Sequence, residues 1–133
     1  MTQAHTDSYY AASANHTFEC VSLKGAERAD VCVVGAGITG LTAALNLAER
    51  GFKVTILEAN QVGWGASGRS GGQMIFGFGC DMPVIEKSAG KVAAPAMWDM
   101  SIEGIYLLRA RLQQHPIECD LKQGHLHAAI KPR

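Results

Sequence analysis

The sequence predicts an α/β fold that begins with a parallel βαβ unit, and three features of residues 30–58 predict it. Four consecutive apolar residues, 31–34, are typical of a parallel strand buried on both faces. The glycine pattern G-x-G-x-x-G follows at once in residues 35–40. A second apolar run, residues 52–57, ends at the acidic residue Glu58. Strand, glycine turn, helix, strand and acid in this order are typical of the first half of a Rossmann-like dinucleotide-binding unit.

Each part of this pattern has a physical task. Gly35 allows the chain to turn sharply off the first strand, and Gly37 leaves room for a pyrophosphate to touch the backbone. Gly40 allows the next helix to pack close to the sheet, and the N-terminus of that helix attracts phosphates. Glu58 can accept hydrogen bonds from both hydroxyls of an adenosine ribose and would repel a 2′-phosphate. The sequence therefore favours FAD or NAD over NADP.

The residues between the two strands predict the connecting helix. Glu49 and Arg50 close it, and Gly51 stands where a left-handed cap is expected. An alternative is a βαβ unit whose glycines only make a tight turn, but the completeness of the pattern favours nucleotide binding. The apolar residues that recur at helical spacing on one face are Ile38, Leu41, Ala44, Leu45 and Ala48.

A glycine-rich loop, residues 63–73, follows the second strand. Ser67 and Gln73 supply hydrogen-bonding groups, and Arg69 supplies a positive charge suited to phosphate. The alternative is a flexible surface loop. Ligands of open sheets bind at the carboxyl ends of the strands, so the position of this loop favours contact with a cofactor.

The flanking segments carry weaker signals. The leader, residues 1–29, contains two adjacent tyrosines, which suit a docked arm as well as a disordered terminus, and both alternatives stay open. Asp81 and Gly90 bracket a short helix with a proline in its first turn. A longer helix is predicted over 95–115, with an apolar stripe for core packing formed by Trp98, Ile102, Ile105, Leu108 and Leu112.

Residues 124–130 alternate like a strand and place His125 and His127 on one face. Two histidines at this spacing could ligate a metal. No third Cys, Asp or His lies near them in the sequence, so we expect a solvated strand face and predict no metal site.

Composition excludes several classes of function. The chain has 133 residues, of which 47% are apolar, and 12 acidic side chains balance 12 basic ones. This balance predicts neither a nucleic-acid partner nor a membrane partner, and no apolar stretch reaches the length of a bilayer span. The N-terminus lacks the basic and then apolar segments of a secretory signal. The cysteines show no zinc-type spacing and fit a reducing cytoplasm better than a disulfide framework, so a cytoplasmic location is expected. Cys32 is expected to be a small residue of the core.

Three segments together resemble the D-amino-acid-oxidase-like FAD oxidoreductases: residues 35–41, residues 57–59 and the glycine-rich loop. Within that family, the more specific resemblance is to the gamma-glutamylputrescine oxidase branch. It comes from residues 8–15, 65–69 and 71–73, and residues 84–88 add to it. The resemblance implies FAD as the cofactor and identifies no catalytic residue. The cofactor-binding residues that the sequence and the resemblance indicate are Gly35, Ala36, Gly37, Ile38, Thr39, Gly40, Glu58, Ala59, Ser67, Arg69, Gly71, Gly72 and Gln73.

The resemblance covers nearly the whole chain but only about the first third of such an enzyme. We therefore expect a leader (1–29), an FAD-binding βαβ unit with its glycine-rich loop (30–80), and a segment (81–133) that leads into a truncated substrate domain. A two-stranded sheet cannot cover both its faces, so the remainder of the same oxidase or a partner chain is expected to complete the fold.

The implied activity is oxidation of a small-molecule amine to an imine, with dioxygen as the acceptor, by the whole oxidase. The isolated chain is expected to be inactive. Two alternatives remain at this point: an NAD-binding dehydrogenase domain, and a non-catalytic nucleotide-binding subunit of a split oxidase.

Overall fold

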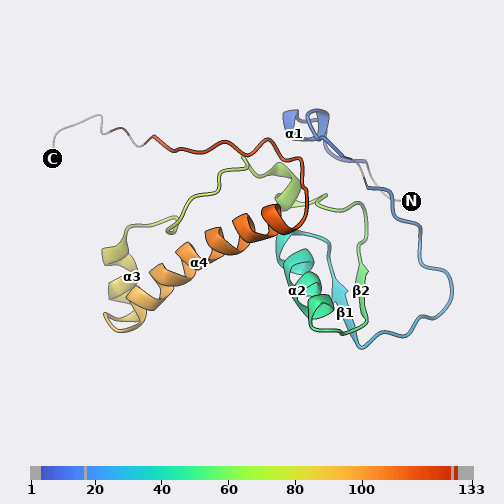
Figure 1. Ribbon diagram of the computed structural model, residues 1–133, viewed down its shortest axis with the longest axis horizontal. Helices are drawn as coiled ribbons and strands as arrows, with labels where there is room; N and C mark the ends of the chain where they lie inside the picture. Colours follow the sequence, from blue (N-terminus) through green and yellow to red (C-terminus); the bar gives the residue numbers. More distant parts are fainter. Residues whose placement is uncertain (1–3, 17, 127, 129–133) are drawn as a thin grey trace. The chain divides into compact units, whose positions relative to one another are not determined.

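A computed structural model describes residues 4–16, 18–126 and 128 of the chain (Figure 1). These residues form two compact units, Met1–Gly72 and Gln73–Arg133. The first unit contains α1, β1, α2, β2 and the 3₁₀ turn η1, and the second contains α3 and α4.

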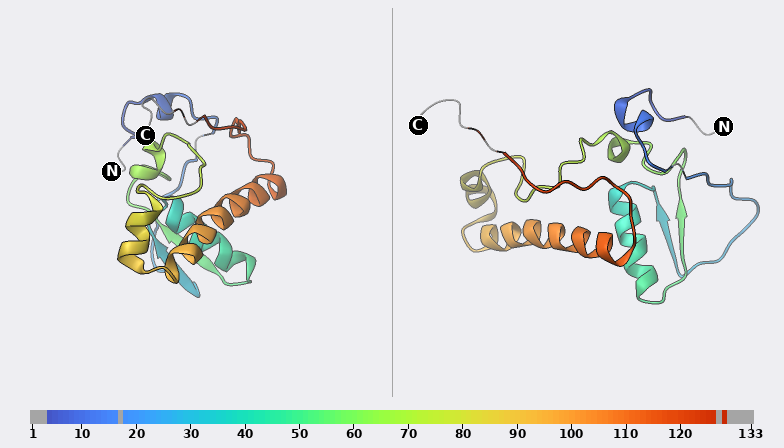
Figure 2. Two further views of the ribbon diagram at one scale, coloured as in Figure 1. Left: turned by 90° about the vertical axis from the view of Figure 1, so that its left-hand side faces the viewer. Right: turned by 45° about the horizontal axis from the view of Figure 1, so that its top comes forward.

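The first unit is built on the predicted βαβ arrangement. Strands β1 (Val31–Val34) and β2 (Val54–Leu57) pair in parallel, with Val31 opposite Val54 and Val34 opposite Leu57. Helix α2 (Ile38–Glu49) connects them and packs against both strands (Figures 1 and 2). The α/β fold class and the parallel strand pair are thus confirmed.

The ends of the helix and of the strands lie close to those predicted from the sequence. Helix α2 begins after Gly37 and ends before Arg50, and Gly51 has the left-handed φ of +89° expected of a C-terminal cap. Strand β2 starts at Val54 instead of Phe52. Just before it, the Lys53 N–H donates to the Asp30 carboxylate over 2.7 Å, and the Asp30 N–H donates to the Lys53 carbonyl over 2.8 Å.

Helix α2 covers one face of the strand pair, and the other face is exposed within this unit. Val33 lies toward α2, whereas Cys32 and Val34 lie on the other face and are exposed, Val34 to 85%. The expectation of a buried Cys32 is therefore wrong, because no described element of this unit packs on that face. On the face of α2 there is an apolar groove of about 400 Å³, lined by Leu41, Ala44, Leu45, Ala48, Val54 and Ile56.

The leader contains a short helix, α1 (Tyr9–Ala12). The Ser8 hydroxyl caps it by accepting a hydrogen bond from the Ala11 N–H over 3.3 Å. Helix α1 contacts η1 (Ala66–Arg69), and the two lie side by side in both views of Figure 2. This part of the leader is thus helical and in contact with the glycine-rich loop, while its role as a docking arm stays a prediction.

The second unit is a pair of helices in contact, α3 (Met82–Ala89) and α4 (Ala93–Gln114). Helix α3 lies between Asp81 at its N-cap position and Gly90 at its C-cap, as predicted, but the Asp81 side chain makes no capping hydrogen bond. Helix α4 starts at Ala93, so Pro95 lies in its first turn instead of opening it. Its apolar stripe is half-buried except at Leu108, which is exposed.

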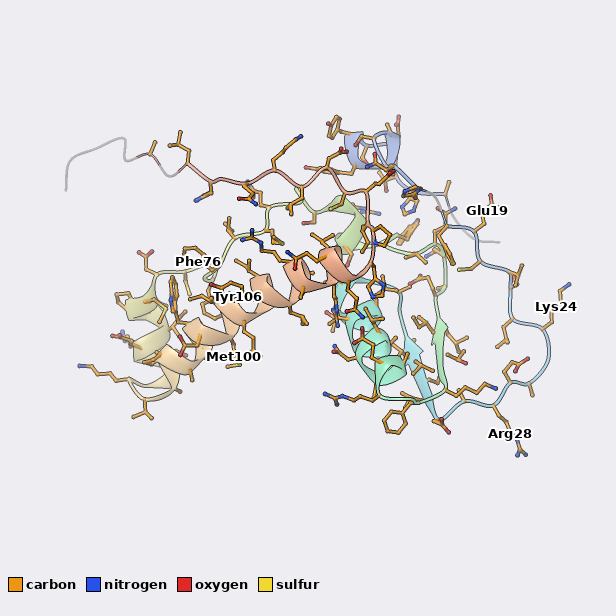
Figure 3. The ribbon with its side chains drawn as sticks, in the orientation of Figure 1. Glu19, Lys24, Arg28, Phe76, Met100 and Tyr106 are labelled. Carbon is orange, nitrogen blue, oxygen red and sulfur yellow. The ribbon has the colours of Figure 1, made fainter. Side chains whose placement is uncertain are left out.

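An aromatic contact ties the start of this unit to α4. The ring of Phe76, which is labelled in Figure 3, meets the ring of Trp98 edge to face, with the two centroids 5.5 Å apart. The Gly77 N–H donates to the Ser101 hydroxyl over 3.0 Å, and that hydroxyl donates to the Trp98 carbonyl over 2.7 Å. The loop before α3 is therefore fixed against the long helix.

The strand predicted over 124–130 is not formed by residues 124–126 and 128. No strand is present in the described part of this unit, so residues 124–126 and 128 have no neighbouring strand to form a sheet with. His127 and residues 129–133 lie outside the described residues. Among the helices described, none is long and apolar enough to cross a membrane.

Candidate cofactor site

The glycine turn between β1 and α2 has the geometry that its sequence predicts. Gly35 has a φ of +100°, which L-residues with side chains rarely adopt, and its N–H donates to the Leu57 carbonyl over 2.7 Å. The next residue, Ala36, is only 2% exposed. A Cβ on Gly40 would collide with the carbonyl oxygen of Gly35, so only glycine allows α2 to start this close to the turn.

The N-terminus of α2 is open to a ligand on its backbone. Its cap residue, Gly37, makes no side-chain hydrogen bond, and the first N–H groups of a helix have no partner within the helix. Ser67 of η1 reaches this end, where its hydroxyl accepts a hydrogen bond from the Ile38 N–H over 2.9 Å. A Cβ on Gly37 would lie 2.9 Å from the same hydroxyl. The structure thus brings together two predicted contact points, the helix N-terminus and the glycine-rich loop.

Glu58 is held beside the glycine turn by backbone donors. Its Oε2 accepts from the Ala36 N–H over 2.8 Å, and its Oε1 accepts from the Asn60 N–H over 2.9 Å. These bonds, the one from Ala36 first, lower the pKa of the carboxyl below its ordinary value and keep it ionised at neutral pH. A backbone hydrogen bond from Ala59 adds to the lowering of this pKa. A carboxylate has about four acceptor positions, so the group still has capacity to accept from a ribose hydroxyl.

The glycine-rich loop is fastened to the turn through its backbone. The Gly63 N–H donates to the Ala36 carbonyl over 2.9 Å, and the Gly68 N–H donates to the Gly63 carbonyl over 2.8 Å. A Cβ on Gly68 would collide with the Gly63 oxygen, so this closure also requires glycine. These contacts hold the loop beside the glycine turn of the first unit, and its contact with a cofactor stays a prediction.

Arg69 is directed by an aromatic neighbour. Its guanidinium carbon lies 5.2 Å from the centre of the Trp64 ring, and its Nη2 donates to the Trp64 carbonyl over 3.4 Å. The charge is exposed and close to η1, where it is free to meet an anion.

The other predicted residues are placed less tightly. Ala59 follows Glu58 and is exposed, and Gly71 and Gly72 are exposed at the end of the first unit. Gln73 is the first residue of the second unit, so its place in the site stays a prediction.

Two contributors were missed from the sequence. Asn60 acts through its backbone N–H, which no residue-type pattern reveals, and Trp64 directs Arg69. A large aromatic side chain inside a glycine-rich loop was the available signal for Trp64. Among the residues described, no group of three or more His, Cys, Asp or Glu could hold a metal ion.

Comparison with known sequences decides the family. The sequence profile of the DAO family, described as FAD dependent oxidoreductase, matches residues 30–132. The chain belongs to this family. Its members depend on FAD, and the glycine turn, the open end of α2 and the ionised Glu58 fit the pyrophosphate and the adenosine ribose of that cofactor.

Two relatives match almost the whole of this DAO-family chain. It is 46% identical over 129 residues to gamma-glutamylputrescine oxidoreductase of Escherichia coli, a match that covers 97% of the chain. It is 47% identical over 131 residues to the probable oxidoreductase OrdL of Haemophilus influenzae, which covers 98% of the chain. The chain spans about 30% of the length of each relative. No solved structure matches it.

Proposed function

We propose that this chain forms the FAD-binding part of a flavin-dependent amine oxidase that acts on gamma-glutamylputrescine or a closely similar amine. The observation that carries the proposal is the 46% identity, over 97% of the chain, to a relative named gamma-glutamylputrescine oxidoreductase. The arrangement of glycine turn, helix N-terminus and fixed acid in the first unit supports the FAD-binding role.

The residues of this chain bind and orient the cofactor. The N-terminus of α2 would hold the pyrophosphate. Its Ile38 N–H is bonded to the Ser67 hydroxyl, which also lies in the space beside Gly37, so Ser67 would be part of the same contact. Glu58 accepts from the adenosine ribose. Ser67 and Arg69 lie along the cofactor and offer a hydroxyl and a positive charge to its anionic part.

Bound FAD supplies a two-electron acceptor. The hydrogen of the C–H bond next to the amine nitrogen would leave with the two electrons of that bond, and FAD would accept this hydride. The amine nitrogen would lose one proton, so that the substrate becomes an imine that water hydrolyses. Dioxygen takes up the two electrons with two protons and leaves as hydrogen peroxide. No general acid or base is assigned to the described residues.

The exposed apolar surface of the first unit supports a need for further polypeptide. Val34 is 85% exposed, and the apolar groove against α2 lies open beside β2. The relatives are much longer than this chain, so the remainder of such an oxidase, or a partner chain, is proposed to cover this surface. A cytoplasmic location belongs to the same proposal.

An amine screen tests this function. A full-length oxidase that carries this chain, made where needed by replacing the matching segment of the Escherichia coli relative, is incubated with gamma-glutamylputrescine, putrescine and glutamate. We expect hydrogen peroxide release with gamma-glutamylputrescine and little with the other two, which lack either the glutamyl group or the diamine.

Two results would contradict the proposal. If none of the amines caused hydrogen peroxide release, the proposed amine oxidase activity would be wrong. Reduction of added NAD without peroxide would favour the dehydrogenase alternative over the oxidase.

A further inference from the structure

The leader of this chain is connected to the glycine-rich loop at several points. The Trp64 indole N–H donates to the Ala4 carbonyl over 2.9 Å. Helix α1 contacts η1, and the Tyr10 hydroxyl lies 3.7 Å from the position that a Cβ on Gly71 would occupy. Residues 4–12 therefore reach the beginning, the middle and the end of the loop formed by residues 63–72.

One of these contacts leads on to a charge in the proposed cofactor site. The hydrogen bond to Ala4 fixes the indole ring of Trp64. The guanidinium carbon of Arg69 lies 5.2 Å from the centre of this ring, and the Arg69 Nη2 donates to the backbone carbonyl of Trp64 over 3.4 Å. An arginine side chain has several rotatable bonds, so a fixed aromatic surface reduces the number of positions it samples. Arg69 also ends η1, whose Ser67 touches the N-terminus of α2.

We propose that residues 4–12 act as a brace that orders loop 63–72 and, through Trp64, positions Arg69 for the anionic part of FAD. This inference rests on the proposed function, because it assigns Arg69 to that cofactor. The match to the family profile begins at residue 30, so residues 4–12 lie outside the segment that the profile matches. Trp64 and Tyr10 are positioning residues, since they act through the loop.

The test uses two pairs of variants in the full-length oxidase. Trp64→Phe removes the indole N–H that binds Ala4, and Trp98→Phe is its control, because Trp98 packs on Phe76 in the second unit. Tyr10→Ala removes the ring that docks on the loop. Its control is Tyr106→Ala, an exposed position on α4 (Figure 3).

Two measurements separate the brace from the cofactor. Hydrogen exchange of the Gly68 amide, which is bonded to Gly63, reports loop order without FAD, and the Gly51 amide at the end of α2 is the internal reference. Trp64→Phe is expected to speed hydrogen exchange of the Gly68 amide about fivefold, because loss of one hydrogen bond shifts the equilibrium for opening of the loop by about this factor. The FAD dissociation constant is expected to rise by a similar factor, and both controls are expected to leave both values unchanged.

A double-mutant cycle shows whether Trp64 acts through Arg69. In an Arg69→Ala background, Trp64→Phe should have little further effect on the FAD dissociation constant, whereas a merely structural role would give additive losses. Unchanged Gly68 exchange in Trp64→Phe and Tyr10→Ala would overturn the brace. Faster exchange with unchanged FAD affinity, or additive losses, would overturn the positioning of Arg69. Failure of the unmodified oxidase to bind FAD would instead overturn the proposed function, and Gly68 exchange would still decide the brace.

Discussion

Gly40→Ala is expected to disrupt the βαβ unit. The added Cβ would collide with the carbonyl oxygen of Gly35, which cannot move away easily because the Gly35 N–H is bonded to Leu57. Helix α2 would have to shift off β1 and lose its contact with Val33. We expect a loss of about 3 kcal/mol or more in the free energy of unfolding, the scale of a severe steric conflict.

Gly104→Ala is the matched control for this change. Gly104 also lies within a helix, α4, but a Cβ there would meet nothing within 4 Å. Alanine at this position is expected to stabilise the protein by about 0.5–1 kcal/mol, because glycine loses more backbone freedom on folding. Urea unfolding of the two variants in the full-length oxidase compares them, and equal stabilities would show that α2 does not approach the turn as described.

Glu58→Arg is expected to weaken FAD binding by about tenfold or more, through loss of a charge-assisted hydrogen bond to the ribose. The substitution would also remove the two carboxylate oxygens of Glu58 that accept hydrogen bonds from the Ala36 and Asn60 N–H groups. Glu49→Arg makes the same change of charge at the exposed end of α2 and serves as the control. The dissociation constant of FAD from the apoprotein of each variant is the measurement.

The informative quantity is the ratio of the FAD dissociation constants of the Glu58→Arg and Glu49→Arg variants. If both variants bind FAD equally well, Glu58 does not contact the ribose, whatever the effect of overall charge. If only Glu58→Arg loses affinity, the loss belongs to the site beside the glycine turn.

The βαβ unit could be predicted in detail because its signals are local. The apolar run of β1, the glycine spacing and the cap at Gly51 each restrict the backbone within a few residues, and the structure follows them. Glu58 could be placed near the turn for the same reason, since parallel pairing brings the end of β2 beside the end of β1.

Features that depend on contacts between distant residues could not be predicted. The leader shows no periodicity, and the contacts that dock it include the indole hydrogen bond from Trp64 to Ala4 and the approach of α1 to η1. Cys32 was expected in the core because a parallel strand is normally covered on both faces, yet the described elements of the first unit cover only one. The alternation over 124–130 predicted a strand that residues 124–126 and 128 do not form, because pairing needs a neighbour.

The identity of the bound cofactor tests the central claim most directly. The full-length oxidase is purified, denatured, and its released chromophore is separated and identified by mass. We expect FAD in about one copy per chain, because Glu58 requires an adenosine ribose and FMN has none. FMN, or a nicotinamide nucleotide without flavin, would contradict the assignment of this site.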